Sequence, residues 1–238
     1  MLEKALKYLV SLKDNKTYEF HGDVYSDHEL HRIVPHVDRP DTVTVNGLDS
    51  IVQMVRSELD MFENKPAFIR IIDHRKVEVL TALDDHMGRD KPYIALCDAP
   101  EFRPGWYTQD EAIIKLRSEF AGTEDVAYLL DLCSSVNRNE GVSSEDNGVS
   151  QTVSARRGVA LKVNVDVRPR VTLAPFRTFM EVEQPASEFI LRLDNDLRIG
   201  LIEADGGRWK MEAKQNIYSF FTTFLNDEIE NGSVVVML

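Results

Sequence analysis

Apolar and polar residues alternate along three segments between residues 158 and 207, and this feature limits the possible folds more than any other part of the chain. Strict alternation is typical of a strand with one buried face and one wet face. The segments are 159–167, 189–193 and 197–201, with a turn at Asp194-Asn195-Asp196 between the last two. The sequence therefore predicts an antiparallel β-meander at the centre of the fold.

A strand–helix–strand unit is predicted ahead of this meander. Apolar residues recur at helical spacing over residues 48–62, and strand-like apolar runs lie on either side, at 41–46 and 67–72. If both strands belong to one sheet, the connection between them is expected to be right-handed.

Helix start and stop signals add further elements. Thr108 and Glu111 have the spacing of a capping box, which predicts the start of a helix that is followed by a second helix up to about residue 136. A C-terminal helix is expected to end at Asn231-Gly232 as a left-handed cap, before a last apolar strand at 233–238. We expect that strand to be interior or paired with another subunit, because an exposed apolar edge promotes aggregation.

The expected class is therefore α+β, with helices packed on the central antiparallel meander. The strand, helix, strand order at the C-terminus leaves open whether there are two lobes of similar topology. Residues 137–148 are polar and rich in turn formers, so we expect a flexible loop there. This loop is predicted to separate an N-terminal α+β lobe, 1–136, from a C-terminal part, 149–238, that holds the meander, a helix and the last strand.

Charge is distributed unevenly. The formal net charge of −12 argues against non-specific binding of nucleic acid or anionic membrane by the surface as a whole. Between residues 154 and 180, however, six basic residues oppose one acid, Asp166, which gives this sector +5 and leaves −17 for the remainder. We expect the acidic and basic faces of neighbouring subunits to meet in a homo-oligomer.

Composition also bears on the compartment. Cys97 and Cys133 lie in apolar runs and are expected to be buried free thiols in a reducing cytosol. No stretch holds about 18 uninterrupted apolar residues, so no membrane span is expected. The first residues lack the apolar core of a signal peptide. The expected location is the cytoplasm.

Four unusual motifs lie in the second half of the chain, at 146–151 (DNGVSQ), 173–179 (LAPFRTF), 181–187 (EVEQPAS) and 203–213 (EADGGRWKMEA). Together with VNGLDSI at 45–51, they resemble an uncharacterised family of proteins from tailed bacteriophages and prophages, a domain of unknown function. The resemblance covers most of the chain from about residue 40. It implies a phage-encoded protein made in the cytoplasm of a bacterial host, and it implies no activity.

The first candidate site lies at Glu203, Asp205, Glu212 and Lys214, of which Asp205, Glu212 and Lys214 would carry the chemistry. Two carboxylates followed by a lysine resemble the core of a metal-dependent nuclease, in which the acids hold Mg²⁺ and the lysine positions the attacking water. The structural alternative is that Asp205 belongs to a turn with Gly206-Gly207. Glu212 would then be an acid that favours the first turn of a helix.

The second candidate is a metal site at His28, His31 and His36, which lie among aspartates in a polar segment. Imidazole and carboxylate together suit Zn²⁺, Mn²⁺ or Fe²⁺. The spacing matches no established motif, and an exposed surface segment explains the same residues. We therefore expect no metal and no cofactor.

The third candidate is a nucleic-acid surface in the basic sector. Its arginines could contact phosphates and its phenylalanines could stack on bases; the residues are Arg156, Arg157, Arg168, Arg170, Arg177, Phe176 and Phe179. The alternative is a solvated strand face whose phenylalanines lie in the core.

These features favour a phage accessory protein that acts by binding and homo-oligomerisation, without a catalytic centre. Two alternatives stay open. One is a nuclease-like enzyme that uses Asp205, Glu212 and Lys214, and the other is a nucleic-acid-binding module that uses the basic sector.

Overall fold

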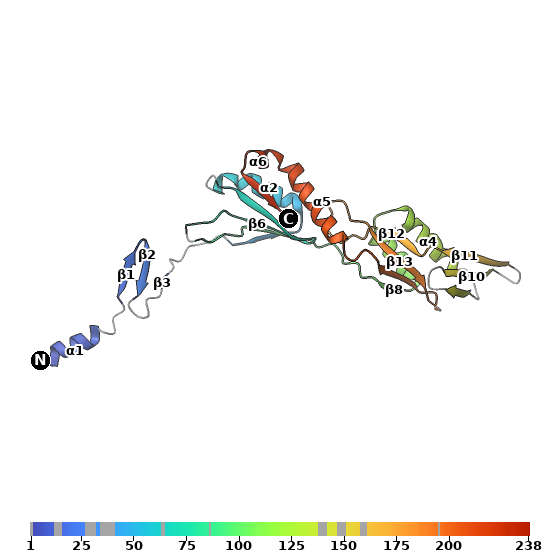
Figure 1. Ribbon diagram of the computed structural model, residues 1–238, viewed down its shortest axis with the longest axis horizontal. Helices are drawn as coiled ribbons and strands as arrows, with labels where there is room; N and C mark the ends of the chain where they lie inside the picture. The colour runs from blue at the N-terminus through green and yellow to red at the C-terminus, as the bar shows by residue number, and fades with distance from the viewer. Residues whose placement is uncertain are drawn as a thin grey trace. The chain divides into compact units, whose positions relative to one another are not determined.

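The computed structural model describes residues 2–11, 16–26, 32–33, 41–62, 65–85, 87–137, 142–146, 151–157, 161–194 and 196–238 (Figure 1). The chain forms two compact units, Met1–Pro40 and Asp41–Leu238. Helices and mainly antiparallel sheets confirm the predicted α+β class.

The first unit contains helix α1 (Leu2–Ser11) and a three-stranded antiparallel sheet of order β1-β2-β3, formed by β1 (Thr17–Phe20), β2 (Asp23–Ser26) and β3 (Arg32–Ile33). His21 and Gly22 join the first two strands with φ angles of 52° and 82°. Positive φ at both central residues is the geometry of a two-residue hairpin turn, and glycine adopts it without strain.

The second unit is built around a five-stranded sheet of order β15-β5-β6-β7-β4. Its strands are β4 (Val43–Val45), β5 (Ala67–Asp73), β6 (Lys76–Leu80), β7 (Tyr93–Leu96) and β15 (Val234–Met237). The pairs β15–β5 and β4–β7 are parallel, and the central pairs are antiparallel. Helix α2 (Leu48–Glu58) and the 3₁₀ turn η1 (Leu59–Phe62) connect β4 to β5, as the predicted strand–helix–strand unit required.

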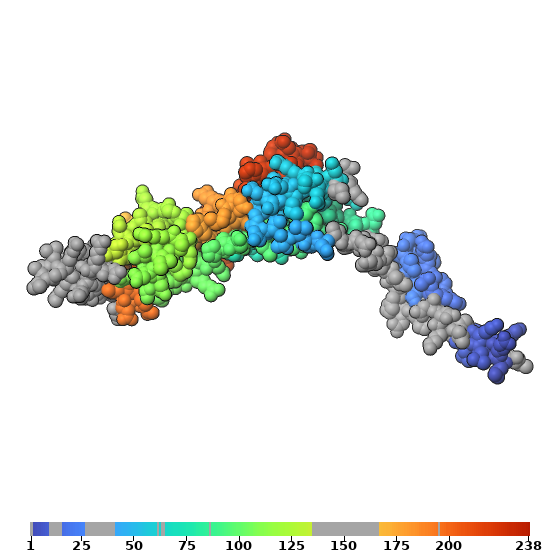
Figure 2. Space-filling view, turned by 180° about the vertical axis from the view of Figure 1, so that it is seen from behind, coloured from blue at the N-terminus to red at the C-terminus, as the bar shows by residue number. Residues whose placement is uncertain are grey.

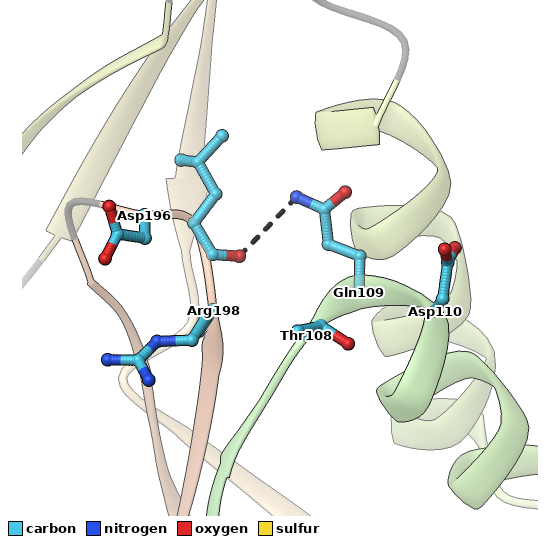
Figure 3. A pocket seen from close by; sticks show the side chains of 6 residues that line it. Thr108, Gln109, Asp110, Asp196 and Arg198 are labelled. Carbon is cyan, nitrogen blue, oxygen red and sulfur yellow. Dashed lines mark hydrogen bonds between the residues drawn. The ribbon is translucent and has the colours of Figure 1, made fainter.

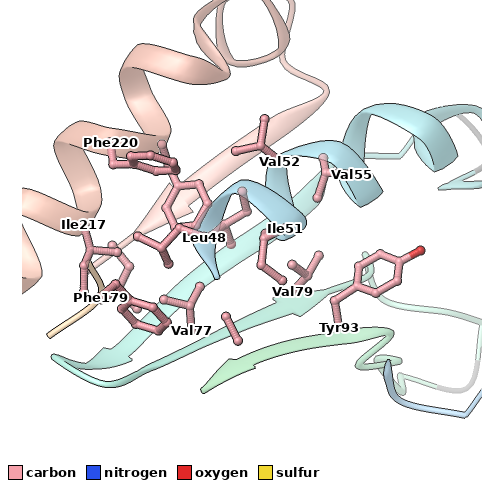
Figure 4. Close-up of a cluster of buried hydrophobic side chains, with 14 of the residues drawn as sticks. Leu48, Ile51, Val52, Val55, Val77, Val79, Tyr93, Phe179, Ile217 and Phe220 are labelled. Carbon is pink, nitrogen blue, oxygen red and sulfur yellow. The ribbon is translucent and has the colours of Figure 1, made fainter. Parts of the chain in front are cut away.

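Helices α2 and α5 (Trp209–Phe224) cover one face of this sheet (Figure 4). Ile51 and Val55 of α2 and Phe221 of α5 are fully buried against Ile69 and Val79 of the sheet. Beyond α5, the short helix α6 (Asn226–Glu230) is followed by Gly232, whose φ of 80° confirms the predicted left-handed end.

The C-terminal helices also contact α2. Arg56 of α2 pairs with Glu228 of α6 at 2.7 Å and donates to the backbone carbonyl of Phe224. Figure 2 shows the red C-terminal segment directly against the blue-cyan segment that contains α2. The first and last parts of this unit therefore share one core.

A four-stranded antiparallel sheet of order β12-β13-β14-β8 forms the second core of this unit. Its strands are β8 (Gly105–Tyr107), β12 (Arg170–Leu173), β13 (Ser187–Leu193) and β14 (Ile199–Glu203). Alternate residues of β13, among them Phe189 and Leu191, are buried, and they pack in one cluster with Leu116 of α3 (Gln109–Ser118) and Leu129 of α4 (Glu124–Asn137).

The meander is confirmed over its last strands and corrected at its first. Strands β12, β13 and β14 are consecutive antiparallel neighbours. Residues 161–167, however, form β11 (Leu161–Val167), which pairs with β10 (Gln151–Arg157) in a separate sheet, and β10 pairs in turn with β9 (Val142–Asp146). Pro169 lies between β11 and β12 and has no N–H to donate to a ladder, so the chain leaves one sheet and enters another there.

The predicted loop and domain boundary also differ from the structure. Strand β9 occupies residues 142–146 of the expected loop at 137–148; residues 138–141 and 147–150 lie outside the described part. Nor does the boundary separate two cores. Strand β15 follows the predicted boundary in the sequence but pairs with β5, which precedes it. Strand β8 precedes the boundary but pairs with β14, which follows it. Pairing between residues distant in sequence overrides the local composition on which the boundary rested.

The last strand, β15, is an edge strand among the described strands and not an interior one. β15 lies at the end of the five-stranded order and hydrogen-bonds to β5 alone among the described strands. Pairing with another subunit stays a prediction.

The capping box supports a direct stability test. Thr108 Oγ1 accepts from the Glu111 N–H, and the Glu111 carboxylate accepts from the Thr108 N–H at 2.9 Å, as predicted. Thr108→Ala removes the acceptor and is expected to lower the free energy of unfolding by about 1 kcal/mol. Thr108→Ser keeps a hydroxyl and is the matched control. Equal urea midpoints for wild type and Thr108→Ala would show that this cap does not stabilise α3.

Candidate functional site

The acidic residues of the predicted nuclease site have structural partners. Asp205 accepts hydrogen bonds from Ser187 Oγ at 2.9 Å, from the Gly207 N–H at 3.0 Å and from the Trp209 N–H at 3.3 Å. Burial disfavours the ionised Asp205 carboxyl, but these hydrogen bonds outweigh it and lower its pKa below the ordinary value. Asp205 therefore organises the turn into α5, which was the structural alternative.

Burial lowers the pKa of the Arg177 guanidinium, and the charges of the nearby Glu203, Asp205 and Glu212 oppose that shift. Glu212 is exposed in the first turn of α5, and Lys214, half-buried, follows two positions later in the same helix. Residues two apart do not share a helix face. No group of three or more His, Cys, Asp or Glu side chains that could hold a metal occurs in the described part of the chain.

The described arginines of the basic sector pair with carboxylates of the same chain. Arg168 contacts Asp125 at 2.9 Å and lies over the Tyr128 ring, and Arg170 contacts Glu188 at 2.9 Å. The side chains of Arg156 and Arg157 lie outside the described residues, as do those of Lys162 and Asp166. The three predicted metal ligands His28, His31 and His36 also lie outside that part.

Two aromatic residues of this sector have different environments. Phe179 is 1% exposed in the core of the five-stranded sheet, so its predicted role as a stacking platform is wrong. Phe176 is half-buried and its backbone N–H donates to the Glu119 carbonyl. An aromatic residue next to alternating strand segments more often fills a core than binds a base. The sequence alone did not show that Phe179 is buried whereas Phe176 is only half-buried.

Arg177, by contrast, is the centre of a buried network. Its side chain is 4% exposed, pairs with Glu203 at 2.5 Å and donates to Ser187 Oγ and to the Pro185 carbonyl. Its guanidinium lies 3.7 Å from the centre of the Trp209 ring. This environment makes Arg177 a structural residue rather than a phosphate contact.

The network extends to His74, at the turn between β5 and β6. The His74 ring meets the Trp209 ring edge-on, with centroids 4.7 Å apart, and Thr178 Oγ1 donates to the His74 carbonyl at 2.5 Å. Burial lowers the pKa of His74, so its imidazole is neutral at pH 7. The buried Nε of Arg177 and Nε1 of Trp209 have no hydrogen-bond partner among the described residues.

A second charged cluster lies on the face of the five-stranded sheet opposite α2 and α5. Glu78 of β6 is 2% exposed, and it pairs with Arg70 at 2.6 Å, with Lys91 at 2.9 Å and with Lys76 at 3.0 Å. Burial opposes ionisation, but hydrogen bonds from the three cations dominate and lower the pKa of Glu78 to about 2. This carboxylate is ionised at neutral pH.

This cluster was missed at the sequence level, although a weak signal existed. Glu78 interrupts the apolar run Val77–Leu80, and alternation places it on the face opposite Val77 and Val79. That pattern alone predicts an exposed acid. Its burial depends on cations from β5, β6 and the segment before β7.

A pocket of about 220 Å³ lies between the start of α3 and the turn that joins β13 to β14 (Figure 3). Gln109 and Asp110 line one side, and Asp196, Leu197 and Arg198 line the other. Its walls carry carboxylates and one guanidinium, and Arg198 is already paired with Asp194 at 2.7 Å. The capping box lies at the helix start next to the pocket. Because the pocket is lined by both acidic and basic side chains, it does not indicate one class of ligand.

Cys97 and Cys133 are buried free thiols, as predicted. Burial raises the pKa of both, that of Cys133 to about 11, so both are neutral at physiological pH. None of the described helices is both long enough and apolar enough to cross a bilayer.

Paired substitutions test the structural account of Asp205 and Glu212. Asp205→Asn weakens three hydrogen bonds to an ionised acceptor and is expected to cost about 1–2 kcal/mol of unfolding free energy. Glu212→Gln removes only an exposed acid near a helix start and is expected to cost less than about 1 kcal/mol. Urea unfolding measures both. Wild-type stability in both variants, with loss of a Mg²⁺-dependent DNA cleavage shown by the wild type, would instead support the nuclease.

The Glu78 cluster predicts acid sensitivity. Because the folded-state pKa is below the ordinary value of 4.5, the stabilisation is fully present above about pH 4.5 and is lost as the pH falls towards 2. We expect about 1–2 kcal/mol from this group, since its partners are partly solvated. Urea unfolding at pH 7 and pH 3 should show a larger loss in wild type than in Glu78→Gln. Equal losses would contradict the assignment.

Comparison with protein-family models, with curated proteins and with solved structures returned no match to this chain. The inferences about its function therefore rest on its own residues.

Proposed function

We propose that the protein acts by binding and forms a homodimer through the open edge of β15. It would serve as a phage-encoded accessory protein in the cytoplasm of a bacterial host, as the motif resemblance implies. The observation that carries the self-association is the composition of β15. Its four residues, Val234–Met237, include no charge, no proline and no glycine.

Natural edge strands usually carry protective features such as charges, prolines, bulges or covering side chains. β12 at the edge of the four-stranded sheet has several of them. Pro169 precedes it, Arg170 begins it, and its Thr172 N–H donates to an Asp125 carboxylate oxygen of α4 at 2.7 Å. The neighbouring Arg168 N–H donates to the Tyr128 hydroxyl at 3.0 Å. Side chains of α4 thus cover the edge of β12.

β15 has an apolar surface beside its open edge. Val234 is buried against the helices, whereas Val235 is 38% and Leu238 55% exposed. Pairing of one β15 with another would satisfy backbone groups and remove this apolar surface from water. Such pairing is the β-strand addition that many protein complexes use.

Symmetry favours a second copy of this chain as the partner that pairs with β15. Two β15 strands that pair antiparallel about a two-fold axis use the same surface on both subunits, so the assembly closes as a dimer. Pairing of β15 with β4, the other edge of the same sheet, would join different surfaces and produce a ring or an open chain. β4 is only three residues long, and its exposed Thr44 is polar.

The nuclease alternative has less support, because Asp205 is engaged by Ser187 and by the start of α5. The binding-module alternative has less support at Arg168, Arg170 and Arg177, because each of these arginines has its own carboxylate partner.

Light scattering at micromolar concentration tests the dimer. Wild type should give twice the chain mass of 27.2 kDa. Val235→Lys places a charge on the edge strand and should give the monomer mass, at a stability cost of about 1 kcal/mol or less. Val43→Lys, an exposed edge position of β4, is the matched control and should remain dimeric.

A wild-type mass of 27.2 kDa would overturn the proposal. Dissociation by Val43→Lys as well as by Val235→Lys would show that β15 pairs with β4 instead. Circular dichroism and a thermal melt confirm that each variant is folded.

A further inference from the structure

The open face of the five-stranded sheet differs in charge from the acidic chain around it. Alternation places Phe68, Arg70 and Ile72 of β5 on the face opposite the helices, since Ile69 and Ile71 point into the core. Arg70 lies opposite Glu78 in the neighbouring strand, and Glu78 opposite Ile94 in the next.

Three cations on this face share one carboxylate. Arg70, Lys76 and Lys91 all pair with Glu78, so the cluster keeps an excess of two positive charges. The cationic side chains are 44%, 38% and 39% exposed, whereas Glu78 is buried beneath them. Solvent, and any ligand, therefore meets the cations first.

Arg89 adds a fourth cation next to this cluster. Its guanidinium lies 4.7 Å from the centre of the Phe68 ring and donates to the Thr81 carbonyl at 2.7 Å. The ring contact and this hydrogen bond hold the guanidinium at the sheet face. Exposed apolar side chains of Ile72 and Leu96 lie at the same face, one on β5 and one on β7.

We propose that this face binds single-stranded nucleic acid, with phosphates at Arg70, Lys76, Lys91 and Arg89 and bases against the guanidinium plane and the apolar side chains. A sheet face that combines cations with planar or apolar groups suits an unpaired strand, because the phosphates and the base faces of such a strand are both accessible. An acidic protein segment would satisfy the charges but would not use the stacking and apolar groups.

The nucleic-acid proposal and the β15 dimer can fail separately. Val235 pairs in register with Phe68, so its side chain lies on the same face of the sheet, and Val235→Lys adds a cation there. This variant should dissociate the dimer and strengthen nucleic-acid binding, whereas Lys76→Gln and Lys91→Gln should weaken nucleic-acid binding and leave the dimer mass unchanged. Failure of one proposal therefore leaves the other in place.

Fluorescence anisotropy with a labelled single-stranded DNA of mixed sequence, about 20 nucleotides long, tests the proposal. Wild type should bind at low salt. With four phosphate contacts, the slope of log K against log salt concentration should be about −2 to −3. Lys76→Gln and Lys91→Gln should each weaken binding several-fold and reduce the slope by about 0.7.

Arg117→Gln removes an exposed cation from α3 and is the control for a change in net charge; it should leave binding unchanged. Glu78→Gln removes the neutralising carboxylate and should tighten binding, whereas a purely structural cluster would show only lower stability. If Glu78→Gln does not fold, the two lysine variants decide the question.

Several results would overturn the proposal. One is no binding by wild type at low salt, and another is equal weakening by Arg117→Gln. Equally tight binding of a poly-glutamate peptide of matched charge would assign the face to an acidic protein partner instead. Weaker binding in both lysine variants, with the control unaffected, supports it.

Discussion

The burial of one guanidinium connects the two cores of the larger unit. Arg177 cannot be buried without compensation, because an unpaired charge in a protein interior is strongly unfavourable. It finds Glu203 and Ser187 in the four-stranded sheet and the Trp209 ring at the start of α5. Asp205 then links Ser187 to the same helix start. Contacts with the four-stranded sheet and with the start of α5 therefore fix the segment around Arg177. The same contacts position α5, which covers the five-stranded sheet.

The two larger sheets share one organisation. Each has one face buried against two helices, and alternate side chains of its strands point to the opposite face. On the five-stranded sheet that face gathers cations around Glu78, and its edge ends in the unprotected β15. A protein that works through such surfaces is suited to binding extended partners, such as another strand or an unpaired nucleic acid.

The candidate sites show where sequence reasoning succeeds and where it stops. The structural alternative for Asp205 could be read from the adjacent glycine pair, since a turn needs only neighbouring residues. The density of arginines at 154–180 could not show that Arg177 is buried while Arg168 is exposed. Counting charges along the chain does not reveal their partners, which come from β14 for Arg177 and from α4 for Arg168. The Glu78 cluster was missed for the same reason.

The sequence by itself determined the local elements. The Thr108–Glu111 capping box, the helical spacing of α2 and the alternation of β13 all depend on residues within a few positions of one another, and all are present. Only the tertiary structure decided which strands pair. β11 joins β10 rather than β13, and β15 joins β5 in parallel across more than half of the chain. Alternation specifies that a strand has a buried face, but its neighbour is chosen by long-range burial and hydrogen bonding, which no short stretch of sequence encodes.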